Sequence, residues 1–557
     1  MRHIGSKSKK FLWAATSIAA VTVAVAVTVA LAASRTAVAA APAAPAAPAC
    51  TASTPVQTED GPVCGLLANG ATSYLGIPYA APPVGALRWQ PPAPVTPWTT
   101  TLQATQPGAD CSQPTFPGST PPTTSEDCLT LNVQVPANAG PAPLPVMVEI
   151  HGGGFLLGGP PDQTHLSATG HVIAVAIHYR LGILGFLANK ALGEHSGDYG
   201  LQDQQAALRW VKRNIARFGG NPDNVTLFGQ SAGGASVCDA AVSPTAAGLF
   251  QKGISESGFY NYWVNTIWSI GDCKSQLLTE RQAQEAGASF AAKVGCGTAT
   301  DVAACLRAVP VQTLIANGGQ ILNPTAGGTI GPTINGTTLP MSAAKAFILG
   351  RLNKIRLMIG VARDEFNGGL YTNLVANTPA QYRELVRQQF GALAPTVMAL
   401  YPLSRFPDSS PFIAYRTVMA DSASVCPALV ADQPLAKHIP VYAFENDNAD
   451  TPTTTPLPIG AFHNAENPFL FPNGTPFDAN QAAFGDQIVA EWAGFARTGN
   501  PTVDGTPLWT RYTNDNRLVM SLVPAGDSAL TTTDTINQQH HCGFWDAVNR
   551  TAPWAPR

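Results

Sequence analysis

Short, largely apolar runs alternate with an amphipathic helix pattern in the middle of the chain. Residues 145–150 and 172–178 are almost continuously apolar, which is typical of strands buried on both faces of a sheet. Residues 201–218 place apolar side chains on one helical face and end at two glycines, a helix with its stop signal. Residues 225–228 form another apolar run. This order predicts an α/β fold with a central, mostly parallel, doubly wound sheet.

Weaker patterns extend this sheet at both ends. Residues 55–79 alternate between apolar and polar positions, which predicts an antiparallel edge. Residues 355–361, 441–444 and 518–523 are further candidate core strands. Residues 240–350 mix helical pieces with Gly/Thr-rich sequence, and we expect inserted helical cap elements there.

A glycine-bracketed serine follows the apolar run at 225–228. The segment Gly229-Gln-Ser231-Ala-Gly233 precedes small residues that can begin a helix. A serine on such a strand-to-helix turn presents its hydroxyl above the sheet, and the glycines let neighbouring segments approach closely. In a chain with 51 glycines the alternative is a plain glycine-rich turn.

Candidate partners for this serine occur downstream of it. A nucleophilic serine needs a base, and the base needs a group that orients it. Asp364 and Glu365 end the 355–361 strand, and His463 lies in a loop after the 441–444 strand. The alternatives are a solvated strand end for the carboxylates and an ordinary loop histidine for His463.

A glycine-rich segment follows the 145–150 strand. Residues 151–155 read His-Gly-Gly-Gly-Phe, and three glycines allow backbone N–H groups to converge on one point, as an oxyanion hole requires. A phosphate-binding loop would continue with Gly-Lys-Ser/Thr, which is absent. We expect His151 itself to be structural.

These segments together resemble type-B carboxylesterases, the α/β-hydrolase branch that includes bacterial p-nitrobenzyl esterases and cholinesterases. The resemblance extends from about residue 55 to 550. The matching motifs are Gly76-Ile-Pro-Tyr-Ala-Ala-Pro-Pro-Val-Gly85, Ser125-Glu-Asp-Cys-Leu-Thr-Leu-Asn132, His151-Gly-Gly-Gly-Phe155, Tyr179-Arg-Leu-Gly-Ile-Leu-Gly-Phe186, Asp198-Tyr-Gly-Leu-Gln-Asp-Gln204, Phe218-Gly-Gly-Asn-Pro222 and Gly229-Gln-Ser-Ala-Gly-Gly234.

The resemblance implies a role for each candidate residue. Ser231 is the expected nucleophile, His463 the base, and Glu365 rather than Asp364 the acid of a Ser-His-Glu triad. The expected oxyanion donors are Gly153, Gly154 and Ala232. The family pattern also implies a structural pair between Arg88 and Glu126.

The N-terminal sequence predicts that the enzyme is exported. Basic residues precede an uncharged apolar run at 11–33, and Ala37-Val38-Ala39 follows, which predicts a signal peptide at 1–39. An uncleaved membrane anchor is the alternative, because the run could span a bilayer. Residues 40–49 are an Ala/Pro linker, and 50–557 form one catalytic domain. We expect a secreted, extracellular protein with no membrane attachment after cleavage.

Charge and ligand types exclude several partners. Removal of residues 1–39 deletes five Lys/Arg and no Asp/Glu, so the net charge changes from −3 to −8. A mildly acidic chain without a basic cluster has no footprint for nucleic acid. No cysteine or histidine spacing matches a metal site, and we expect neither a metal nor a cofactor. The oligomeric state stays open.

Ten cysteines follow the predicted signal, and an even count in an exported chain favours disulfides over buried free thiols. The family pattern implies the pairs Cys111–Cys128 and Cys296–Cys305. Position and elimination then leave three further pairs, Cys50–Cys64, Cys238–Cys273 and Cys426–Cys542.

The resulting hypothesis is a serine carboxylesterase that hydrolyses a small-molecule ester. No tryptophan lies between Cys111 and Cys128, and Gln230 precedes the serine where many relatives of this family carry glutamate. Both features disfavour quaternary ammonium esters, so we expect neutral short- to medium-chain esters. The alternatives are a non-catalytic cholinesterase-like binding module and a lipase or polyester hydrolase.

Overall fold

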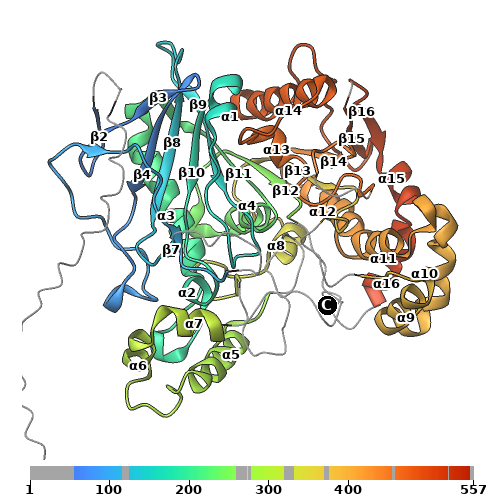
Figure 1. Cartoon of the computed structure of the whole chain (residues 1–557), viewed down its shortest axis with the longest axis horizontal. Helices are drawn as coiled ribbons and strands as arrows, with labels where there is room; N and C mark the ends of the chain where they lie inside the picture. The colour runs from blue at the N-terminus through green and yellow to red at the C-terminus, as the bar shows by residue number, and fades with distance from the viewer. Residues whose placement is uncertain are drawn as a thin grey trace, which may run out of the picture. The chain divides into compact units, whose positions relative to one another are not determined.

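The structure is a computed structural model that describes residues 50, 55–115, 124–258, 273, 277–318, 331–368, 375–453, 458–524 and 526–551 (Figure 1). The predicted signal peptide at 1–39 and the linker at 40–49 lie outside the described residues. None of the helices in these ranges combines the length and apolar character needed to cross a membrane.

An eleven-stranded sheet forms the centre of the described chain, in the order β16-β15-β14-β13-β12-β11-β9-β10-β8-β4-β3. Its strands are β3 (Leu66–Ala68), β4 (Ala71–Pro78), β8 (Thr130–Pro136), β9 (Leu144–Ile150), β10 (Ile173–Ile177), β11 (Gly220–Gln230), β12 (Lys252–Glu256), β13 (Arg356–Ala362), β14 (Val441–Asn446), β15 (Leu518–Leu522) and β16 (Ala529–Thr532). Strands from β10 to β15 pair in parallel, whereas β3, β4, β8 and β16 pair antiparallel at the two edges. The predicted sheet, parallel in the middle with an antiparallel N-terminal edge, is confirmed.

Both faces of the sheet are buried, which explains the continuous apolar runs. On β9, Val146 and Val148 contribute to one core together with α3 (Tyr199–Asn214) and α4 (Ala232–Val242). Met147 faces the opposite core, which contains side chains of α1 (Thr164–Gly170) and α14 (Ala479–Thr498). Helix α3 leads into a 3₁₀ turn that ends at Gly219, whose φ of 86° is a left-handed conformation that suits glycine.

Two helical groups are inserted between the sheet strands (Figure 1). The first, between β12 and β13, contains α5 (Glu280–Lys293), α6 (Val302–Ala308), α7 (Val311–Asn317) and α8 (Ala343–Leu349). The second, between β13 and β14, contains α9 (Pro379–Phe390), α10 (Ala394–Leu400), α11 (Pro411–Ala420) and α12 (Cys426–Leu435). The other strands and α-helices of the described residues are β1 (Val56–Gln57), β2 (Pro62–Cys64), β5 (Leu102–Gln103), β6 (Asp110–Cys111), β7 (Thr124–Ser125), α2 (Gly182–Phe186), α13 (Asn467–Leu470), α15 (Thr533–Gln539) and α16 (Cys542–Thr551).

Disulfides join segments that the sheet alone does not fix. The structure brings all ten cysteines together in pairs: Cys50–Cys64, Cys111–Cys128, Cys238–Cys273, Cys296–Cys305 and Cys426–Cys542. Of these, the last spans 116 residues and attaches the start of α16 to the start of α12. Because a crosslink over a long loop removes more entropy from the unfolded chain, this bridge has the largest expected effect on stability.

Candidate active site

Ser231 occupies a strained turn between β11 and α4. Its φ of 61° and ψ of −124° lie outside the regions that side-chain-bearing residues ordinarily adopt. The turn is fixed on the next strand, because the Ser231 N–H donates to the Glu256 carbonyl at the end of β12 over 2.8 Å. The Ser231 carbonyl in turn accepts the N–H of Ala235 in the first turn of α4. Strain of this kind persists only where the surrounding structure enforces it.

Glycine is required on both sides of this serine. A Cβ on Gly233 would lie 1.9 Å from the Ile150 carbonyl oxygen, and one on Gly229 would lie 2.4 Å from the same atom. Residues 229 and 233 therefore lack side chains because the start of α4 packs directly on the end of β9. This close approach also places the segment after β9 beside Ser231.

Glu365 and His463 meet through a hydrogen bond between the Glu365 Oε1 and the His463 Nδ1. Glu365 follows β13 and is fully buried. Its second oxygen accepts the Ser257 hydroxyl over 3.1 Å and the Ala362 N–H over 3.0 Å. A carboxylate held in this way fixes the proton of a neutral imidazole on Nδ1 and leaves Nε2 as the acceptor.

Asp364 has a different hydrogen-bond partner from Glu365. Its Oδ2 accepts the Ala461 N–H over 3.1 Å, within the loop that carries His463. Burial raises the pKa of Asp364 to about 6, although Arg363 opposes this shift. The structure thus places Glu365 against the imidazole and Asp364 against the backbone of the loop.

His463 also contacts the residue before the serine. The Gln230 Nε2 lies 3.2 Å from the His463 Nε2 and 3.3 Å from its Nδ1. In the described part of the chain, no hydrogen bond joins the Ser231 hydroxyl to His463. Catalytic hydrogen bonds are often long without substrate and shorten only in the complex, so this arrangement remains compatible with a base at 463.

The glycine-rich segment after β9 passes beside the serine. A Cβ on Gly152 would lie 3.1 Å from the Ser231 Cβ, and Gly153 and Gly154 have φ values of 100° and 63°. Ala232 is the first residue of α4 and is buried. The three expected oxyanion donors therefore belong to the two segments that flank Ser231.

Two further histidines near these elements contact groups other than the triad candidates. His151 stacks on Tyr179 with ring centroids 4.5 Å apart, and burial lowers its pKa to about 4. The His178 Nε2 donates to the Asp110 carboxylate over 3.2 Å. Among the described residues, no group of three His, Cys, Asp or Glu side chains is arranged to hold a metal ion.

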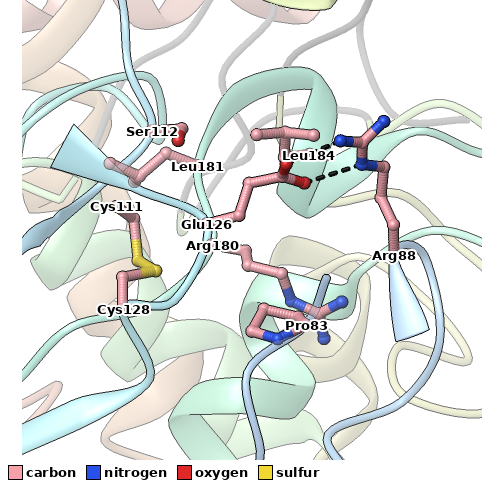
Figure 2. A pocket seen from close by; sticks show the side chains of 9 residues that line it. All are labelled: Pro83, Arg88, Cys111, Ser112, Glu126, Cys128, Arg180, Leu181 and Leu184. Carbon is pink, nitrogen blue, oxygen red and sulfur yellow. Dashed lines mark hydrogen bonds and ion pairs between the residues drawn. A yellow bond between two sulfur atoms is a disulfide. The ribbon is translucent and has the colours of Figure 1, made fainter. Parts of the chain in front are cut away.

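The Arg88–Glu126 pair lies in a separate small cavity beside the Cys111–Cys128 disulfide (Figure 2). Both carboxylate oxygens of Glu126 accept from Arg88 at 2.6 Å. The remaining Arg88 nitrogen donates to the carbonyls of Arg307 and Val309, at the end of α6. This pair joins the first helical insertion to the N-terminal part of the chain.

Sequence reasoning missed two polar residues around the triad candidates. They are Ser257, which donates to Glu365, and Glu466, whose pKa is raised to about 7 by burial and by Glu365. It singled out Gln230 for its lack of charge but did not foresee its contact with His463. Glu466 follows His463 by three residues, a spacing that could have drawn attention to it. Nothing in the local sequence distinguishes Ser257, because its contact joins the ends of β12 and β13.

Comparisons with known proteins show the family of this chain. A sequence model of the carboxylesterase family matches residues 52–545. Para-nitrobenzyl esterase of Bacillus subtilis (strain 168) is 34% identical over 493 residues, covering 84% of this chain and 94% of the relative. Cocaine esterase of Homo sapiens is 32% identical over 541 residues, covering 89% of this chain and 91% of the relative. A solved PNB esterase structure matches with a TM-score of 0.72 at 32% identity, covering 87% of this chain and 99% of that one.

The sheet order, the helices on both faces and the serine turn define an α/β-hydrolase fold. The chain belongs to the carboxylesterase family, as its family match and its relatives show. It is a carboxylic ester hydrolase.

Proposed function

We propose that this chain is a secreted serine carboxylesterase that acts through an acyl intermediate on Ser231. His463 serves as the base and Glu365 orients it. The observation that supports this assignment most directly is the hydrogen bond that the His463 Nδ1 donates to Glu365, beside a serine whose backbone is strained.

The reaction needs only groups of this chain and water. The Ser231 Oγ attacks the ester carbonyl carbon while the His463 Nε2 takes up the hydroxyl proton. The carbonyl oxygen becomes an oxyanion that the N–H groups of Gly153, Gly154 and Ala232 stabilise, each good donor contributing roughly 3–4 kcal/mol. His463 then returns the proton to the departing alcohol. Water repeats the sequence on the acyl-serine, releases the carboxylic acid and restores the hydroxyl.

Neutral esters of short or medium chain length are the proposed substrates. The residue before the nucleophile, Gln230, is an uncharged amide, and it is buried against the proposed base. A quaternary ammonium group therefore finds no carboxylate at this position, and the sequence between Cys111 and Cys128 offers it no tryptophan.

Export is part of the same proposal. Residues 1–39 would direct secretion and be removed, 40–49 would act as a linker, and 50–557 would form the catalytic domain. Five disulfides in the described chain support an oxidising compartment. N-terminal sequencing of the secreted protein tests the cleavage after Ala39. An intact N-terminus on a membrane-bound product contradicts it.

Substitution of the serine tests the catalytic assignment. Ser231→Ala should abolish hydrolysis of p-nitrophenyl acetate and butyrate and block labelling by an organophosphate, while the thermal unfolding midpoint changes little. Ser236→Ala, at a buried serine in the same helix, is the matched control and should keep both activities. Undiminished turnover by Ser231→Ala contradicts the proposal, and absence of turnover in the wild type favours a binding module.

A further inference from the structure

The face of the His463 ring is covered by the side chain of Gln230. The amide nitrogen lies 3.2 Å from one ring nitrogen and 3.3 Å from the other. A donor aligned with the in-plane lone pair of one nitrogen would lie much closer to that nitrogen than to the other. At the ring edge between them, the Cε1–H leaves no room for an amide. The near-equal distances therefore place the amide nitrogen over the ring face.

This contact differs in kind from the one made by Glu365. The carboxylate holds the ring edge at Nδ1, which still permits the ring to rock about that hydrogen bond. An amide over the face opposes this rocking and does not itself occupy the ring edge at Nε2. The two contacts together define both the position and the plane of the imidazole.

Gln230 is itself held between the ring and the glycine-rich segment. Its side chain is 6% exposed, and its amide oxygen would lie 3.4 Å from a Cβ on Gly152. The residue thus extends from the oxyanion segment to the base, and its backbone continues directly into Ser231. Packing on two sides restricts the amide to one orientation.

Charge gives the amide a second effect. An N–H group over an aromatic face is attracted by a neutral ring and repelled by a cationic one. Among the described residues, two charged groups act on His463, namely Glu365, after β13, and Glu466, just before α13, whereas the nearby end of β11 carries the uncharged Gln230 and leads into Ser231. Burial and, after it, Glu466 raise the pKa of Glu256, at the end of β12. The dipole of the Gln230 amide therefore opposes the effect of these carboxylates and favours the uncharged imidazole.

We propose that Gln230 is a positioning residue for His463, an amide that fixes the plane of the ring and favours its uncharged form. This inference rests on the proposed role of His463 as the base, and it adds a residue that the triad does not include.

Two substitutions separate shape from charge. Gln230→Met keeps the volume and removes the N–H group, so kcat should fall about tenfold because the ring plane is less well defined, with KM within about twofold. Gln230→Glu keeps the shape and places a carboxylate over the ring. It should recover most of kcat at its own pH optimum, while the acid limb of the kcat/KM profile moves up by about 1 pH unit.

Gln205→Glu and Gln205→Met are the matched controls. Gln205 is 5% exposed in α3 and donates to Ser243, away from His463, so neither change should alter the profile per folded molecule. Concentrations of working enzyme come from organophosphate titration. A wild-type kcat in Gln230→Met, an unmoved acid limb in Gln230→Glu, or the same shift in Gln205→Glu overturns the inference. A failed proposed function is recognised separately, by turnover that persists in Ser231→Ala.

Discussion

Two buried histidines in this chain each contact a carboxylate through Nδ1 but differ in the groups that surround the rest of the ring. His463 and His540 are 3% and 4% exposed, and each contacts a carboxylate through Nδ1. For His540 this carboxylate is Asp421, at 2.6 Å. The difference lies at the other nitrogen: the His540 Nε2 forms an ion pair with Glu445 at 3.3 Å, whereas the His463 ring meets an uncharged amide.

The second carboxylate favours the charged form of His540. Burial opposes its charge, but Asp421 and Glu445 outweigh burial and raise the pKa of His540 well above its ordinary value. Tyr401 donates to Asp421 over 2.8 Å, and Trp545 donates to Tyr401 over 2.7 Å. A histidine that retains its proton this firmly cannot accept one from a serine. A buried histidine–carboxylate pair therefore does not by itself identify an active site.

The largest expected effect concerns the carboxylate of His463. Glu365→Gln should lower kcat/KM for p-nitrophenyl esters by about 10⁴-fold, because an amide no longer fixes the proton on Nδ1. Asp364→Asn, one residue away, keeps an oxygen for the Ala461 N–H and should cost less than about tenfold. If the two variants exchange these effects, the acid of the triad is Asp364.

The disulfide beside His540 should affect stability alone. Its loop of 116 residues corresponds to about 4.8 kcal/mol of unfolding free energy in the loop-entropy account. The Cys426→Ser/Cys542→Ser double variant should lose roughly this amount in urea unfolding and keep its kcat. Cys296→Ser/Cys305→Ser is the comparison, because its loop of 9 residues corresponds to about 2.6 kcal/mol. A kcat that falls with the long-loop bridge would show that the His540 region contributes to catalysis.

Removal of the His540 imidazole tests the cation directly. His540→Gln leaves Asp421 and Glu445 buried without their cation, which should cost about 3–5 kcal/mol of unfolding free energy. Activity per folded molecule should stay within about threefold of the wild type. His541→Gln, at the adjacent and partly exposed histidine, should cost less than about 1 kcal/mol. Equal losses in the two variants would refute the structural role of the cation.

A feature of this molecule can be predicted from the sequence when a local pattern or motif produces it. A contact between distant segments leaves no such pattern. The strands at 144–150 and 173–177 were predictable because burial on both faces produces a continuous apolar run. Ser231, Glu365 and His463 were proposed because the chain order of an α/β-hydrolase can be read from separate motifs. The cation at His540 could not be predicted, because Asp421 and Glu445 come from distant segments that share no spacing pattern.

The smallest expected effect is a pH dependence that only one of the two histidines should show. The folded-state pKa of His540 is raised, so its contribution to stability is fully present below the unfolded-state pKa of about 6.5. Between that pKa and the folded-state pKa, the folded protein holds one proton that the unfolded chain has released. The unfolding free energy should therefore fall by about 1.4 kcal/mol per pH unit across this interval, and the contribution is lost as the pH rises through the folded-state pKa.

Other buried groups also titrate as the pH rises, so the useful quantity is the difference between the wild type and His540→Gln. Urea unfolding from pH 6 to pH 10 should show the stability gap between them narrowing as the pH increases. The gap between the wild type and His541→Gln should not narrow over the same range, because burial and Arg405 lower the pKa of His541 and its contribution to stability therefore does not fall as the pH rises. A constant gap for His540→Gln would mean that the imidazole is uncharged in the folded protein. In that case the two histidines would differ only in their neighbours and not in charge, and the distinction between base and cation would have to be abandoned.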